Sequence, residues 1–152
     1  MFRFGKQVES ALLALKALSG LKGEGLAISE ICLKHGLSKN TLSKVMQNLH
    51  AAKILESSQG LRGGYKLQRN LRLISFYEVL DALGEIKKLK CTNNETCDLV
   101  QNCSISSPLQ IWEKRFEENL KSTSLYELLN GNNNSIDTAN KPNKIISETA
   151  CL

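Results

Sequence analysis

The sequence lacks the patterns that would place this protein in a membrane, in a secretory pathway or among enzymes. No uninterrupted apolar run among its 152 residues approaches the roughly 18 residues that a membrane-spanning helix requires. The stretch Met1–Lys6 has no apolar segment followed by a small-residue cleavage site, so we expect a cytoplasmic protein. The chain also shows no Ser/His/Asp or Cys/His catalytic arrangement and no glycine-rich phosphate loop between a strand and a helix. We therefore expect neither an enzyme nor a small-molecule substrate.

The composition is that of a small folded protein with an uneven charge distribution. Hydrophobic residues make up 41% of the chain, which is enough for a core and excludes wholesale disorder. Residues 1–72 hold 12 basic and 4 acidic side chains, a net charge of +8, whereas residues 73–152 hold 8 and 11, a net charge of −3. A basic first half favours a polyanionic partner, although a chance distribution of solvated surface charge explains it equally well at this stage.

Apolar periodicity predicts a mainly α-helical chain with one β-hairpin. The hairpin is expected at residues 54–67, where two short β-type runs flank a glycine-rich turn. Residues 85–106 lack a steady period and are interpreted as a loop, and residues 130–152 as a disordered tail. The expected helices span residues 6–19, 29–35, 38–52, 75–83, 107–121 and 124–129.

Local start signals support these helices. Ser29, Ser38 and Ser107 each stand where an N-cap belongs, the last followed by a first-turn proline. Ser75 with Glu78 three residues later forms a capping-box pattern.

Helix, tight turn, helix and hairpin, in this order over residues 29–67, are typical of a winged helix–turn–helix. Gly36 permits a sharp turn between the two helices, and Leu37 fills the space between them. The start of the second helix would then face base edges in the major groove of double-stranded DNA. The residues expected to contact DNA are Ser38, Lys39, Asn40, Thr41, Ser43 and Lys44 from the helix and Gln59, Arg62, Gly63 and Gly64 from the hairpin.

These residue types are suited to different parts of the DNA. Asn40 can make a bidentate contact to adenine, while Lys39 and Lys44 are suited to phosphates. The hairpin glycines let the backbone approach a sugar–phosphate strand, and Arg62 can reach toward the minor groove. The alternative is that the winged helix is a protein-docking module.

Three of the five cysteines form the pattern Cys91-x5-Cys97-x5-Cys103 in the predicted loop. In a reducing compartment three nearby thiols favour a metal site over a disulfide, and soft thiolates select zinc or iron–sulfur clusters. Both usually take four protein ligands, so the spacing leaves an iron–sulfur cluster, zinc and redox-active thiols all open. Cys32 is interpreted as a small core residue, and Cys151 receives no role.

The combination resembles the family of winged-helix iron–sulfur cluster transcriptional regulators that includes IscR and NsrR. The resemblance covers residues 1–129 and depends on Gly36–Leu42, on Gly60–Leu67 and on the Cys-x5-Cys-x5-Cys loop before a long helix. It implies a homodimer built on that helix, a partly palindromic operator, and a 2Fe–2S or 4Fe–4S cluster held by Cys91, Cys97 and Cys103.

Two positions depart from the family pattern. IscR-like members have a histidine ligand three residues after the third cysteine, where this chain has Ser106. NsrR-like members use a carboxylate from the first helix of the partner subunit, and the matching residue here is Glu9, our candidate fourth ligand. In the hairpin, Gln59 replaces an arginine that many relatives carry before the glycine, which puts the operator sequence in doubt.

The sequence therefore predicts a cytoplasmic, homodimeric regulator that binds DNA and senses redox, nitric oxide or iron–sulfur status. Residues 1–84 form the winged helix–turn–helix, 85–106 the cluster-binding loop, 107–129 the dimerisation helix and 130–152 the disordered tail. The alternatives are a regulator controlled by zinc or thiol oxidation and a small electron-transfer protein.

Overall fold

The computed structural model describes residues 4–21, 25–58, 63–88 and 103–131. Over these residues the chain is mainly helical, with a single two-stranded antiparallel sheet among the described segments. None of the described helices is long and apolar enough to cross a membrane. Residues 132–152 of the predicted tail and residues 89–102 of the predicted cysteine loop lie outside the described residues.

The first helix packs one face into the core. Helix α1 (Lys6–Ser19) begins and ends where its apolar periodicity predicts. Ser10 lies within the buried face, where its hydroxyl donates to the Lys6 carbonyl oxygen over 2.7 Å, so the polar group is satisfied inside the helix. The buried residues are Val8, Ser10, Ala11, Ala14, Leu15 and Leu18.

The two helices of the helix–turn–helix follow. Helix α2 (Ile28–His35) begins before the predicted Ser29, so that N-cap prediction is wrong. Ala27 occupies the N-cap position, and the Glu30 carboxylate accepts its backbone N–H at 3.0 Å. The acidic side chain therefore satisfies the N–H of the N-cap residue, as the N3 glutamate of a capping box does. Helix α3 spans Lys39–Ala51.

The hairpin is confirmed as strands β1 (Leu55–Ser58) and β2 (Gly64–Leu67). Its register pairs Leu55 with Leu67 and Ser57 with Tyr65. A third segment joins its outer edge, because Leu26 and Tyr65 exchange two backbone hydrogen bonds of 3.0 Å. This bridge ties the hairpin to the chain that leads into α2.

The remaining helices build the second half. A short 3-10 helix, η1 (Leu71–Leu73), precedes α4 (Phe76–Ala82). Ser75 and Glu78 form the predicted capping box, with the Glu78 carboxylate accepting the Ser75 N–H at 2.8 Å. Two backbone hydrogen bonds of 2.9 Å, from Phe76 to Thr123 and from Leu125 to Ile74, then join the start of α4 to the end of the long helix.

The long helix begins earlier than expected. Helix α5 spans Ser106–Ser122 with Ile105 at the N-cap position, so the predicted Ser107 N-cap is wrong. The Ile105 carbonyl accepts the first helical bond from Leu109, and Pro108 still lies in the first turn, where its missing N–H costs no helical bond. Helix α6 (Leu125–Asn130) is confirmed, and Ser124 and Glu127 form a capping box at its start.

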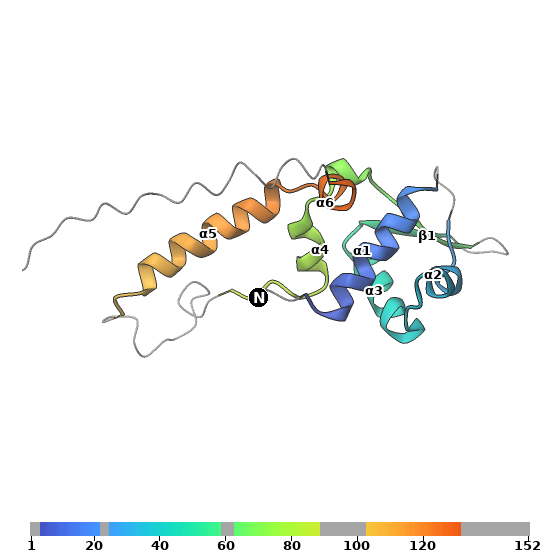
Figure 1. Ribbon diagram of the computed structural model, residues 1–152, viewed down its shortest axis with the longest axis horizontal. Coiled ribbons are helices and arrows are strands. Elements are labelled where there is room, and N and C mark those ends of the chain that lie inside the picture. Colours follow the sequence, from blue (N-terminus) through green and yellow to red (C-terminus); the bar gives the residue numbers. More distant parts are fainter. Residues whose placement is uncertain (1–3, 22–24, 59–62, 89–102, 132–152) are drawn as a thin grey trace, which may run out of the picture.

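One hydrophobic core unites α1, α3, α4 and the base of the hairpin. Figure 1 shows these elements gathered at one end of the molecule, while α5 extends away from them with its first residues at the far end. The largest fully buried side chains include Leu15, Leu42, Met46, Leu49, Ile74 and Leu125. Cys32, predicted as a core residue, is half-buried and packs against this core.

Candidate nucleic-acid interface and sensor region

The turn between α2 and α3 has the conformation that its glycine predicts. Gly36 adopts φ 64°, and a Cβ there would meet nothing within 4 Å. The glycine is therefore required by the left-handed backbone and not by crowding. Leu37, predicted to lie between the helices, is half-buried against the core.

Helix α3 separates an apolar face from a polar one. Its buried face consists of Leu42, Val45, Met46 and Leu49, all 0% exposed, which fixes the rotation of the helix on the core. The predicted DNA-contacting residues lie on the other side, with Ser38, Lys39, Asn40 and Lys44 exposed and Thr41 and Ser43 half-buried.

Ser38 stands at the N-cap position of α3 but does not cap it with its side chain. Its backbone carbonyl accepts the Leu42 N–H at 2.9 Å, whereas its hydroxyl makes no capping hydrogen bond. The expectation that the Ser38 hydroxyl caps the helix is therefore wrong. Its exposed side chain stands at the positive end of the helix dipole, a position suited to contacting an anion.

The hairpin residues predicted at the DNA are described only in part. Gln59 and Arg62 lie outside the described residues, whereas Gly63 and Gly64 are half-buried. At Gly64 an added Cβ would lie 2.5 Å from the Leu26 carbonyl oxygen. The glycine is thus needed for the close approach of two protein segments, and its contact with DNA stays a prediction.

The predicted metal ligands lie on separate elements. Cys103 is a free, half-buried thiol three residues before α5, and Glu9 is exposed in the first turn of α1. Cys91 and Cys97 lie outside the described residues. Within the described part of the chain no group of three histidine, cysteine or acidic side chains is placed to hold a metal ion. Ser106, at the position of the family histidine, accepts a hydrogen bond from Gln110 at 3.2 Å.

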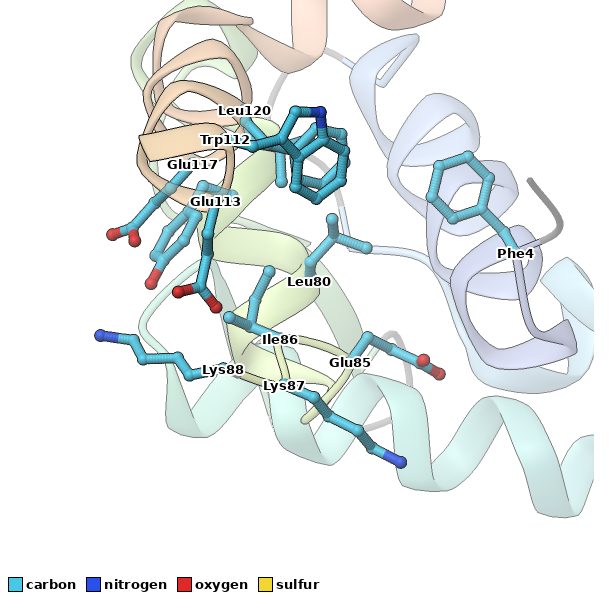
Figure 2. A pocket seen from close by; sticks show the side chains of 12 residues that line it. Phe4, Leu80, Glu85, Ile86, Lys87, Lys88, Trp112, Glu113, Glu117 and Leu120 are labelled. Carbon is cyan, nitrogen blue, oxygen red and sulfur yellow. The ribbon is translucent and has the colours of Figure 1, made fainter. Parts of the chain in front are cut away.

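An apolar pocket of about 280 Å³ lies between α5, α4 and the N-terminal segment. Figure 2 shows Trp112 above Leu80 and Ile86, with Phe4 on the opposite side. Trp112 is 62% exposed and stacks on Phe116, with ring centroids 5.4 Å apart and an interplanar angle of 4°. The sequence indicated the spacing of these aromatic residues, but the pocket is formed by residues distant in the chain.

Charged side chains at the rim of this pocket attach α5 to α4. Lys121 pairs with Glu117 at 2.6 Å and lies 4.8 Å from the centroid of the Tyr77 ring. The Lys121 hydrogen bond lowers the pKa of Glu117, and the same bond raises the pKa of Lys121. Burial, with the nearby Glu117 carboxylate, raises the pKa of Tyr77 above its ordinary value of 10.0. Sequence reasoning missed this cluster, for which only the i,i+4 spacing of Glu117 and Lys121 gave a signal.

A second ion pair connects the hairpin to α4. Arg69, two residues after β2, pairs with Glu78 at 2.7 Å. Burial of Glu78 raises its pKa, but the Ser75 backbone N–H and Arg69 outweigh that effect and hold the pKa below its ordinary value. Both side chains are partly exposed, so solvent weakens the interaction. The sequence alone did not indicate this pair.

One family model matches most of the described chain. Residues 4–131 match Rrf2, described as an iron-dependent transcriptional regulator. A protein designated an HTH-type transcriptional regulator in Aquifex aeolicus (strain VF5) is 23% identical over 131 residues, covering 84% of this chain and 91% of that protein.

Two solved structures show the same fold. CymR, the global cysteine regulator of B. subtilis, aligns with a TM-score of 0.63 and 20% identity, covering 86% of this chain and 98% of that one. IscR of T. potens aligns with a TM-score of 0.64 and 23% identity, covering 85% and 87%. The predicted winged-helix fold and the predicted family resemblance are both confirmed. Because the family match spans most of its length, this chain belongs to the Rrf2 family of transcriptional regulators.

Proposed function

We propose that this protein is a homodimeric DNA-binding regulator that senses redox, nitric oxide or iron–sulfur status through a cluster held by Cys91, Cys97 and Cys103. The observation that carries the proposal is the position of Cys103. Its free, half-buried thiol lies three residues before α5, the helix that runs from the cysteine loop to the DNA-binding half.

The DNA-binding half has the surface that the proposal requires. The exposed lysines at 39 and 44 are suited to phosphates, and Asn40 between them is exposed for a base edge. A dimer would place two α3 helices in successive major grooves about 34 Å apart, which explains a partly palindromic operator.

The proposed dimer interface is the apolar face of α5. Ile105, Ile111 and Trp112, on or next to this helix, are each more than half exposed. Monomeric proteins rarely expose several large apolar side chains close together. The Trp112–Phe116 stack gives a flat aromatic surface to the second copy. An α5 helix from the partner subunit is the occupant that we propose for this face.

The donor set suits an iron–sulfur cluster. Three thiolates are the ligands that such clusters prefer, and the exposed Lys87 and Lys88 supply positive charge at the entry to the loop. In Figure 1 the beginning of α5 lies well away from α1 of the same chain. This separation favours Glu9 of the partner subunit over the chain's own Glu9 as the fourth ligand.

The chain's own residues would transmit a change in the cysteine loop to the DNA-binding helices. When bound, the cluster supplies the reactivity toward nitric oxide or oxygen. The thiolates would hold the loop against the start of α5, and Lys121 with Glu117 fixes the other end of α5 on Tyr77 of α4. A shift of α5 would thus reach the winged helix and alter the separation of the two recognition helices.

Anaerobic purification followed by iron, zinc and acid-labile sulfide analysis tests the cluster. We expect iron and sulfide in equal amounts and visible charge-transfer absorption, both lost in Cys103→Ala. Cys32→Ala is the matched control and keeps the full cluster content, because Cys32 lies on α2 and packs against the core. Glu9→Ala should retain the cluster but lose it faster in air. Wild-type protein without sulfide would overturn the cluster proposal.

A second candidate is regulation by zinc or by thiol oxidation. The structural likeness to CymR, a cysteine regulator, favours it, and the free thiol of Cys103 is compatible with it. The same metal analysis decides, since stoichiometric zinc without sulfide, or no metal at all, supports this candidate. Membership of a family of transcriptional regulators favours either candidate over the electron-transfer alternative.

A further inference from the structure

His50 connects the recognition helix to the hairpin. It lies in the last turn of α3, and its Nε2 atom is 3.4 Å from the Ser57 hydroxyl of β1. Its ring also meets the ring of Tyr65 in β2 edge to face, with centroids 6.2 Å apart and an interplanar angle of 79°. Ser57 and Tyr65 are cross-strand partners in the hairpin register. One side chain of α3 therefore contacts both strands at the same rung.

The rung that His50 contacts is on the inner face of the hairpin. Side chains alternate along a strand, so Ser57 shares a face with Leu55, and Tyr65 shares a face with Leu67. The Leu55–Leu67 pair packs in or against the core. The contacts of His50 lie one rung further out, toward the turn. The opposite face carries the exposed ion pair between Glu56 and Lys66.

The hairpin depends on such contacts for its orientation. Each strand has four residues, and an isolated two-stranded hairpin is at best marginally stable in water. The backbone bridge between Leu26 and Tyr65 holds one edge beside the start of α2. Leu55 and Leu67 hold the base of the hairpin on the core, and the solvent-exposed contact of His50 with Ser57 ties it to α3 one rung further out.

We propose that His50 is a positioning residue for DNA binding, which holds the hairpin at a fixed angle to α3. The helix and the hairpin can contact one duplex together only if this angle matches the spacing between the major groove and the adjacent backbone. His50 thus acts through Ser57 and Tyr65, and not by touching DNA. The inference rests on the proposed DNA-binding function.

The experiment measures DNA affinity in a double-mutant cycle on an operator selected from random sequence. We expect His50→Ala and Ser57→Ala each to weaken binding by about three- to tenfold, the effect of losing one modest polar or aromatic contact. The double variant should be no weaker than His50→Ala, because the two residues serve one contact. His50→Gln, whose amide can still reach the Ser57 hydroxyl, should restore part of the affinity.

The chain offers a matched control in Ser58→Ala. Ser58 is the same residue type on the same strand, but its side chain lies on the other face, where its hydroxyl is 3.5 Å from the Gly64 carbonyl oxygen. Its affinity should stay within about twofold of wild type. If the losses in His50→Ala and Ser57→Ala add, or if Ser57→Ala binds like wild type, His50 acts directly on DNA and the proposal is wrong.

Amide hydrogen exchange of the free protein separates this inference from the proposed function. His50→Ala should speed exchange at the β1 and β2 amides while leaving exchange in α1 and α4 unchanged. This readout needs no DNA, so it can support the contact even if no operator is found. Unchanged exchange in the hairpin would overturn the inference while leaving the proposed regulator intact.

Discussion

Replacing Gly64 by alanine should separate the hairpin from the segment that precedes α2. The added Cβ would lie 2.5 Å from the Leu26 carbonyl oxygen and 2.6 Å from its carbon, where ordinary contacts begin at 3.4 Å. Both opposing atoms belong to the backbone, so no side chain can rotate away. The two segments must therefore move apart by about 1 Å.

The cost follows from the bonds that this movement breaks. The two 3.0 Å hydrogen bonds between Leu26 and Tyr65 would lengthen beyond the usual range, a loss of about 1 kcal/mol each. Alanine also restricts the unfolded chain, which raises the free energy of unfolding by roughly 0.5 kcal/mol. Residual crowding around the new Cβ lowers it by roughly the same amount, so these two effects cancel. We expect Gly64→Ala to lower the free energy of unfolding by about 2 kcal/mol.

Urea unfolding followed by circular dichroism measures this loss. Gly20→Ala is the control, because a Cβ there meets only the Ala17 carbonyl oxygen at 3.7 Å and the backbone is already αR. It should remain within about 0.5 kcal/mol of wild type. If Gly64→Ala unfolds at the same urea concentration as Gly20→Ala, the close approach of Leu26 does not constrain the hairpin and the reasoning fails.

Three further predictions concern DNA binding, pH and assembly. Lys39→Ala and Lys44→Ala should each reduce the slope of log affinity against log salt by about 1, measured by fluorescence anisotropy, whereas Lys114→Ala on α5 should not. Because the pKa of Glu78 is held below its ordinary value of 4.5, its ionised form stabilises the fold above that pH, and this stability is lost as the pH falls further. Glu78→Gln should therefore flatten the acid limb of a plot of unfolding midpoint against pH, and an unchanged limb would contradict the assignment. Trp112→Glu should convert a dimer to a monomer in sedimentation experiments, while Glu118→Gln should not.

Local signals in the sequence predicted much of the fold. The Ser75–Glu78 capping box and the glycine at the α2–α3 turn were found because each depends on residues within four positions. The start of α2 was missed because it also involves a long-range contact. The segment before α2 is held by Tyr65, almost forty residues later, so a nearby serine was a misleading guide.

In the candidate DNA interface, too, local features were predictable and long-range contacts were not. The exposed start of α3 was predictable because the buried apolar residues of the helix determine which side faces solvent. The contacts of His50 with the hairpin, and the pocket between α4 and α5, were not predictable, because they bring together residues from separate elements. The packing role of Gly64 also appeared only in the structure, since the sequence showed a flexible glycine and not the carbonyl beside it.

If the cysteine loop controls DNA binding, removing the cluster must change the affinity for DNA. The affinity of anaerobically purified protein for a selected operator should be measured before and after removal of iron by chelation, with Cys103→Ala as a cluster-free reference. We expect a change of about tenfold or more on chelation, to the affinity of Cys103→Ala. Equal affinities in the loaded, chelated and Cys103→Ala proteins would contradict it.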